Sequence, residues 1–354
     1  AAPTPVSAYL HAAAMVKAGV YLIARLAPGF SILATWQVLV IGAGVLTMLL
    51  GGYRALRQSD LKLVLAFGTV SQLGFIISLV GRGEQSIALA GLALLASHAI
   101  FKACLFLTVG VIDLSTGTRD LRRLSGLGKQ MPVLAVASGI AIAIMAGLPP
   151  TLGFVAKEAA LHALHESHKF FDQLLLIGVV IGSILTLAYG LRWWWGAFGT
   201  KPSCAPTKIE RISPTIVFSP ALLGALSLVL GLFPHQLETI LSGHASLYRG
   251  ESGHLALWSG FGVPLALTGV VILAGITMFW FRAQIEAIQA RFAEIPSAQD
   301  AYRSTLRIIN NFAADLTSFF QRGSLPAYLS TMLMTTVVSI WVVVLMNPSI
   351  WPSR

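Results

Sequence analysis

Residues 97–102 read Ser97-His98-Ala99-Ile100-Phe101-Lys102 and lie near the middle of an apolar run from Ile87 to Ile112. That run is long enough to span a bilayer, which takes about 20 apolar residues. His98 and Lys102 are four positions apart, so they share one face of a helix. A lysine in hydrocarbon costs at least about 2.5–3.5 kcal/mol, which water, a partner or a function must offset. The alternative is a lysine that snorkels to the interface, but the nearest acidic residues are more than ten positions away.

The composition indicates an integral membrane protein. Mean hydropathy is +0.78, and 11% of the 354 residues are charged, against about 25% in a soluble domain. A net charge of +10 in such a chain is typical of cytoplasmic loops. No basic run is interleaved with aromatic residues, so nucleic acid is not an expected partner. Cys104 lies in a predicted span and Cys204 in a polar loop, so no disulfide is expected.

The hydropathy pattern predicts an all-α, polytopic transmembrane helix bundle of about nine spans, with one broken helix and an amphipathic lateral segment. Loops rich in lysine and arginine alternate along the chain with loops that are poor in them, and the rich loops are expected in the cytoplasm. This places Ala1 on the cytoplasmic side and Arg354 outside. The expected spans cover residues 5–26, 33–50 (ending at Gly51-Gly52), 61–80, 87–112, 132–165, 173–189, 215–233, 263–281 and 327–346.

The fifth span is interrupted by Gly147-Leu148-Pro149-Pro150-Thr151-Leu152-Gly153. A double proline removes two backbone donors and breaks the helical ladder. Broken helices at membrane depth occur where they are buried in protein or line a wet cavity. Lys157 and Glu158 follow, so this break is a candidate functional site. The alternative is that Pro149 ends a span and Lys157 opens a loop.

Other polar residues lie inside predicted spans. His11 and Lys17 are six positions apart in the first span, so a regular helix would point them about 120° away from each other. Ser71 and Gln72 in the third span are candidates for helix packing or for binding water. Residues 283–323 mix charged and apolar side chains, which predicts amphipathic helices, split near Pro296, on the membrane or against partner helices.

Four blocks of the sequence resemble, in order, the proton-translocating antiporter-like family. They are PTPVSAYLHAAAMVKAGVYLIAR (3–25), DLKLVLAFGTVSQLGF (60–75), SHAIFKACLFLTVG (97–110) and AGLPPTLGFVAKE (146–158). The family includes the large antiporter-like subunits of respiratory complex I and subunits of Mrp-type cation/proton antiporters. Two further blocks, GVIDLSTGTRDLRRLSGL (110–127) and HLALWSGFGVPL (254–265), resemble the A subunit of the Mrp-type Na⁺/H⁺ antiporter.

The resemblance implies a row of buried lysines and histidines near mid-membrane along which protons pass. His11 and Lys17 match the helix that bridges two symmetry-related halves, and His98 and Lys102 match the relay of the second half. Lys157 matches the lysine beside the broken helix, near the external exit. Glu158, Ser71 and Gln72 are secondary candidates.

The resemblance also implies a domain organisation. It consists of the second half of an antiporter-like module (1–235), an extra transmembrane helix (236–282), amphipathic lateral helices (283–325) and a terminal transmembrane helix (326–354). The family's first half, with its glutamate–lysine pair, has no counterpart here. Because the chain begins at Ala1, without Met, we expect a piece of a longer polypeptide.

The expected function is that of a secondary transporter subunit in the cell membrane, which exchanges protons for Na⁺ within a hetero-oligomeric antiporter complex. Its partners would be the other subunits, the transported ions and the lipid bilayer. No motif for a nucleotide, flavin, haem, iron–sulfur cluster or other metal is present, so neither a cofactor nor enzymatic chemistry is expected. Two alternatives stay open: a proton-pumping subunit of a complex I-like oxidoreductase or membrane hydrogenase, and an assembly piece that braces a neighbour.

Overall fold

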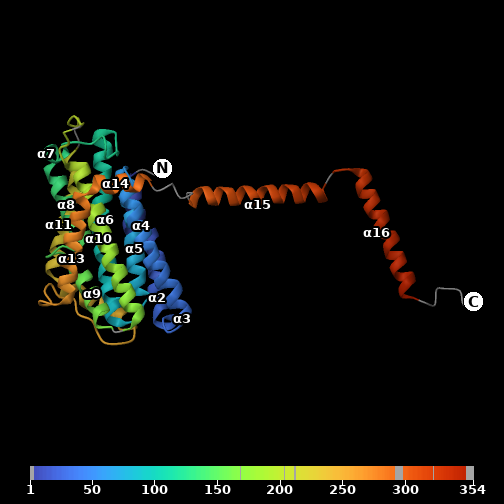
Figure 1. Cartoon of the computed structure of the whole chain (residues 1–354), viewed down its shortest axis with the longest axis horizontal. Coiled ribbons are helices and arrows are strands. Elements are labelled where there is room, and N and C mark those ends of the chain that lie inside the picture. The colour runs from blue at the N-terminus through green and yellow to red at the C-terminus, as the bar shows by residue number, and fades with distance from the viewer. Residues whose placement is uncertain are drawn as a thin grey trace, which may run out of the picture. The chain divides into compact units, whose positions relative to one another are not determined.

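The computed structural model describes residues 4–167, 169–202, 204–210, 213–291, 298–321 and 323–347. Within these ranges the secondary structure is helical, apart from two isolated β-bridges (Figure 1). The chain divides into two units, Ala1–Gln289 and Ala290–Arg354, which are described separately. The first unit comprises α1 (Thr4–Ala8), η1 (Tyr9–Ala13), α2 (Met15–Phe30), α3 (Ala34–Trp36), η2 (Gln37–Ile41), α4 (Gly42–Arg57), α5 (Leu61–Val80), α6 (Gln85–Thr116), α7 (Leu127–Gln130), α8 (Pro132–Ala146), α9 (Leu152–Glu166), α10 (Phe170–Phe198), α11 (Pro214–Leu232), α12 (Pro234–Ala245), α13 (Val263–Trp280) and most of α14 (Arg282–Arg291).

The polytopic membrane bundle expected from the sequence is confirmed. In the described part of the chain, eight helical segments are long and apolar enough to cross a membrane. The remaining expected span is the broken one, formed by the shorter helices α8 and α9. The eight segments are Val6–Phe30, Ala34–Arg57, Leu61–Val80, Gln85–Thr116, Phe170–Phe198, Pro214–Leu232, Val263–Trp280 and Leu325–Met346.

The first span is not the regular helix that the sequence pattern predicted. Residues Tyr9–Ala13 form a π-helical turn, in which the Ala14 amide donates to the Tyr9 carbonyl at 3.2 Å. A π turn holds its hydrogen bond five residues apart, so the angular positions of an α-helix do not carry through it. The 120° separation of His11 and Lys17 expected for a regular helix therefore does not apply, because His11 lies within this turn and Lys17 follows it in α2.

Gly51 and Gly52 do not end the second span, as the sequence pattern had suggested. They lie inside α4, which continues to Arg57. A Cβ at position 51 would lie 2.6 Å from the amide nitrogen of Ser71 on α5. The glycines therefore bring α4 and α5 into close backbone contact, the usual role of small residues between membrane helices.

The helices α5 and α6 form the centre of the first unit (Figure 1). α5 packs against α4, α6 and α10, and α6 also contacts α8, α9 and α11. Asp60 caps the start of α5, where its carboxylate accepts from the Lys62 amide at 2.7 Å and the Leu63 amide at 3.1 Å. α6 ends at Gly117 in the left-handed conformation, with φ at 66°.

Two sets of polar contacts, made by Arg82 and by Lys201, join segments at the ends of the bundle. Between α5 and α6, Arg82 donates to the carboxylate of Asp172, at the start of α10, with one nitrogen–oxygen distance of 3.0 Å. After α10, the ammonium group of Lys201 donates to the carbonyls of Leu121, Leu124 and Gly196. Burial lowers the pKa of Lys201, and its bonds join two loops that are distant in sequence.

The second unit contains α15 (Ala298–Phe320) and α16 (Leu325–Met346). α15 is amphipathic, as predicted for this part of the lateral segment. The break expected near Pro296 lies outside the described residues. α16 is apolar and long enough to cross a membrane.

Candidate functional site

The central histidine and lysine of α6 are completely buried. Both His98 and Lys102 have 0% exposure, and their spacing places them on one face of the helix. The ammonium group of Lys102 donates to the Leu65 carbonyl of α5 at 3.2 Å. The alternative of a snorkelling lysine is wrong, because the side chain turns into the protein. Within the described residues, Lys102 has no recorded ion pair, so its charge is solvated by a backbone dipole and not by a carboxylate.

Several buried polar atoms around this face have no hydrogen-bond partner among the described residues. They include both ring nitrogens of His98, the hydroxyl of Ser97 and the carbonyl oxygen of the Gln72 side chain. Buried polar groups are almost always hydrogen-bonded. Water is the partner that a buried polar site of this kind takes. The arrangement therefore favours a hydrated face of α6.

The first span brings its basic residues toward the same face. The imidazole of His11, on η1, stacks on Phe106 with 5.3 Å between ring centroids and 15° between planes. Phe106 lies one helical turn beyond Lys102. Lys17 is close enough to interact electrostatically with His98. Thus four of the predicted relay residues gather around α6: His11, Lys17, His98 and Lys102.

The break between α8 and α9 confirms the interruption expected at Gly147–Gly153. α8 ends at Ala146, and Gly147 adopts a φ of +81°, which favours glycine. A Cβ at Gly147 would lie 2.6 Å from Cδ of Lys157, and one at Gly153 would lie 1.8 Å from the Ile144 oxygen. The break is therefore a close-packed turn that only glycine allows at these two positions.

Lys157 points into this break. Its side chain is 5% exposed, and its ammonium group donates to the carbonyls of Met145 and Ala146, both at 3.0 Å. These carbonyls end α8, where the helix dipole favours a positive charge. The alternative that Lys157 opens a solvated loop is wrong.

The neighbouring Glu158 faces a different helix. It is 3% exposed, and its carboxylate accepts from the Thr268 hydroxyl of α13 at 3.1 Å. It makes no recorded ion pair with Lys157 in the described structure, so it is not a contact counter-charge of that lysine. This agrees with the roughly 100° rotation between successive helical residues.

The two polar residues of α5 make defined contacts. Ser71 donates to the Met48 carbonyl of α4 at 2.7 Å, which is a helix-packing contact. The amide nitrogen of Gln72 donates to the Thr186 hydroxyl of α10 at 3.0 Å. The helix α10 also carries Tyr189, a fully buried residue that the sequence reasoning missed. A tyrosine in an apolar segment carries no charge, so hydropathy gives no signal of it.

The Tyr189 hydroxyl lies between the surroundings of the two lysines. It donates to the Gly68 carbonyl at 3.4 Å and lies 3.7 Å from the sulfur of Met145. Lys102 donates to Leu65, one turn before Gly68, and Lys157 donates to the carbonyl of Met145 itself. Residues from α5, α8 and α10 thus connect the two buried ammonium groups.

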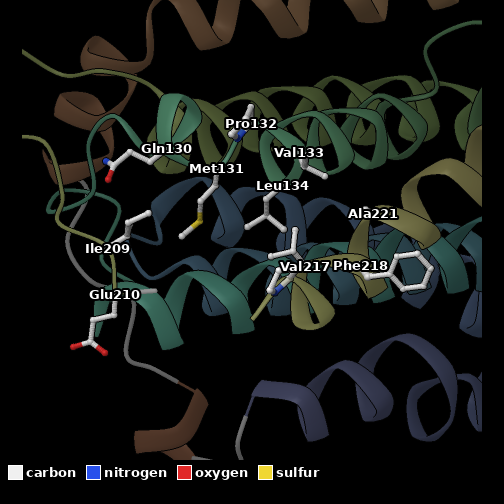
Figure 2. A pocket seen from close by; sticks show the side chains of 11 residues that line it. Gln130, Met131, Pro132, Val133, Leu134, Ile209, Glu210, Val217, Phe218 and Ala221 are labelled. Carbon is white, nitrogen blue, oxygen red and sulfur yellow. The ribbon is translucent and has the colours of Figure 1, made fainter. Parts of the chain in front are cut away.

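A separate hollow of about 640 Å³ lies between the starts of α8 and α11. Figure 2 shows Gln130 and Glu210 at one end and Phe218 at the other. Its lining is mainly apolar, and none of the predicted relay residues contributes to it. In the described residues, no group of three or more His, Cys, Asp or Glu side chains could hold a metal ion.

Comparisons with known proteins show the family to which the chain belongs. A family described as "NADH:quinone oxidoreductase/Mrp antiporter, TM" matches residues 1–186. The A subunit of the Na⁺/H⁺ antiporter of Alkalihalophilus pseudofirmus is 41% identical over 310 residues, which cover 78% of this chain and 38% of that protein. The chain therefore spans well under half of that relative's length.

Two solved structures show the same helical arrangement. A chain of the Mrp complex from Dietzia sp. DQ12-45-1b superposes with a TM-score of 0.86 at 32% identity, covering 98% of this chain and 38% of that one. A chain of respiratory complex I from Thermus thermophilus superposes with a TM-score of 0.58 at 27% identity, covering 70% and 52%.

Proposed function

The chain belongs to the family of the A subunit of Mrp-type Na⁺/H⁺ antiporters, and we propose that it serves as one subunit of a multisubunit cation/proton antiporter in the cell membrane. In this proposal protons move along a buried row of lysines and histidines, and their movement is exchanged for that of Na⁺. The other subunits of the complex are its protein partners.

The observation that carries the proposal is the complete burial of Lys102, with its ammonium group on a backbone carbonyl. A buried amine gives up its proton more easily than a solvated one, because burial disfavours the charged form. His98 is adjacent on the same face, and histidine titrates near neutral pH when unperturbed. The two groups can therefore hold and release protons where hydrocarbon alone would block them.

We infer an order along the row. Lys17 and His11 receive protons on the side of the first span, His98 and Lys102 pass them along α6, and Lys157 releases them beside the broken helix. The contacts of His11 with Phe106, and of Lys157 with the end of α8, support the two ends of this order. Each occupied site repels a proton on its neighbour, so filling one site favours release from the next.

The experiment that tests the proposal is proton flux in vesicles that contain the full complex. Adding Na⁺ on one side should draw protons across the membrane toward that side, in exchange for Na⁺, without any electron donor. Parallel additions of K⁺ and choline would identify the exchanged cation. If none of these cations moves protons while a quinone-linked donor does, the chain serves a redox-driven pump.

The redox-driven pump is the second candidate, because the matching family also includes NADH:quinone oxidoreductase. The greater structural similarity to the Mrp complex favours the antiporter. The neighbouring genes would also separate the two candidates, since small antiporter subunits accompany the first and redox subunits the second.

A further inference from the structure

We propose that the Tyr189 hydroxyl is the proton-transfer group between Lys102 and Lys157, a role that rests on the proposed transport function. The proposal stands on contacts that place one hydroxyl beside the immediate surroundings of both amines. It concerns a residue outside the charged row, on a helix that supplies none of the lysines or histidines of that row.

The first support is the position of the hydroxyl along α5. Lys102 donates to the Leu65 carbonyl at 3.2 Å, and Tyr189 donates to the Gly68 carbonyl at 3.4 Å. Residues three apart on a helix are separated by about 4.5 Å along its axis. The two side chains therefore bind carbonyls about one turn apart on α5, and this is the separation across which we propose that water carries the proton.

The second support is the position of the hydroxyl relative to the break. Its oxygen lies 3.7 Å from the sulfur of Met145, whose own carbonyl accepts from Lys157 at 3.0 Å. The same residue therefore contacts the phenol through its side chain and the ammonium group through its backbone. Tyr189 is also held tightly, since a Cβ on Gly68 would lie 2.9 Å from its ring.

The third support is the polarity around the hydroxyl. The side chains of Thr186 and Gln72 interact electrostatically with it, and the Gln72 oxygen has no hydrogen-bond partner among the described residues. A phenol can accept and donate hydrogen bonds at the same time. Its hydrogen bond to the Gly68 carbonyl, at 3.4 Å, is long compared with about 2.7–2.8 Å for a typical O–H···O bond. The ring is tightly packed, but the hydroxyl group is weakly held and able to reorient.

The transfer step conserves protons and leaves the phenol neutral. On the Lys102 side, a proton carried by water binds a lone pair of the tyrosine oxygen, forming one O–H bond. At the same time the original O–H bond breaks, and that proton passes to water on the Lys157 side. Rotation of the hydroxyl then restores the starting orientation, so no ionised intermediate is required.

The test compares Tyr189→Phe with Tyr248→Phe in the full complex in vesicles. Tyr248 is the matched control, because it is also buried and its hydroxyl donates to the Ala24 carbonyl at 2.8 Å, away from the row. Tyr189→Phe should lower cation-driven proton flux by roughly tenfold or more, since positioned proton-transfer groups contribute about 10²–10⁴-fold and water replaces part of this. Tyr248→Phe should leave the flux per complex unchanged.

Melting temperatures separate this role from a structural one. Tyr248→Phe removes the shorter hydrogen bond, so its complex should melt at or below the temperature of the Tyr189→Phe complex. Wild-type flux in Tyr189→Phe, when Lys102→Ala has lost flux, would overturn this inference and leave the transport proposal standing. Wild-type flux in Lys102→Ala would instead remove the transport proposal itself.

A second variant covers the case in which Tyr189→Phe fails to accumulate. Genetic incorporation of 3-fluorotyrosine at position 189 keeps the ring and the hydroxyl but makes the phenol more acidic. The rate of proton flux at a fixed pH should then differ from wild type, because transfer rates depend on the acidity of the transferring group. The same substitution at position 248 should not change the rate. An unchanged rate at position 189 would refute the role.

Discussion

The ammonium nitrogen of Lys157 lies 3.0 Å from the main-chain oxygen of Met145, twelve residues earlier in the chain. This contact joins α9 to the end of α8 across the broken span. The lysine satisfies the exposed end of a helix, and in the transport function that we propose it would also carry the proton on the exit side.

The first prediction separates these roles at Lys157. Arginine keeps the hydrogen bonds to the α8 carbonyls but does not release its proton. Lys157→Arg should therefore retain the protein in the membrane and lose most of the cation-driven flux. Lys157→Met should also lose stability, by about 1–3 kcal/mol, because two buried carbonyls lose their donor. Flux in vesicles and melting of the purified complex measure the two effects, and wild-type flux in Lys157→Arg would contradict the relay role.

The second prediction concerns Lys102. Lys102→Ala removes a charge that is expensive to bury, so the complex should assemble normally. Cation-driven flux should fall by roughly 10²-fold or more, the scale of a proton-transfer group. Lys129→Ala is the control, because Lys129 is exposed on α7 and outside the row. Equal flux in both variants would show that Lys102 carries no proton.

The third prediction tests the contact of α4 with α5. Gly51→Ala places a methyl group 2.6 Å from the Ser71 amide nitrogen, which is backbone and cannot rotate away. Such overpacking should cost about 1–3 kcal/mol and lower the yield of folded protein. Gly42→Ala in the same helix has nothing within 4 Å and should have no such effect. Melting temperatures and membrane yields would compare them, and equal behaviour would refute the close contact.

The fourth prediction concerns the buried ion pair of Arg82 and Asp172, whose side chains are 6% and 0% exposed. Asp172→Asn leaves a buried guanidinium with Glu84 at 3.6 Å as its remaining charged partner. Breaking a buried pair costs about 3–5 kcal/mol, so the melting temperature should fall clearly. Asp120→Asn removes the partner of the exposed Arg122 and should change little.

A double variant tests whether the lower melting temperature of Asp172→Asn comes from the buried Arg82 charge, which has lost its partner. Combining Arg82→Gln with Asp172→Asn removes both charges, so the double variant should melt above Asp172→Asn alone. If Asp172→Asn melts like the wild type, the pair contributes nothing to stability.

The sequence predicts most of the fold for physical reasons that are visible in single residues. Pro149 and Pro150 cannot continue a helix, so the break in the fifth span is encoded locally. Gly51 and Gly52 were misread because glycine weakens an isolated helix. Their close contact with α5 overrides that preference, and it involves a residue distant in sequence. The charge pattern likewise identified His98, Lys102 and Lys157, since charges in apolar runs are conspicuous.

Tyr189 could not be predicted in the same way. Its importance depends on Gly68 and Met145, which lie on other helices and carry no polar side chain. The contact of Glu158 with Thr268 also depends on the tertiary fold, because α13 is more than a hundred residues away in the chain. The sequence pattern identifies unusual residues, whereas the contacts between those residues can be identified only from the three-dimensional structure.

The π-helical turn at Tyr9–Ala13 has a consequence for insertions and deletions. Such a turn contains one residue more than an α-helix needs to cover the same rise. Deleting one residue within it would therefore restore an ordinary helix and leave the segments on either side in their present orientation. The change would be confined to the turn itself, where His11 stacks on Phe106. The number of residues in the turn therefore sets the position of the imidazole, whereas the orientation of the rest of the span does not depend on it.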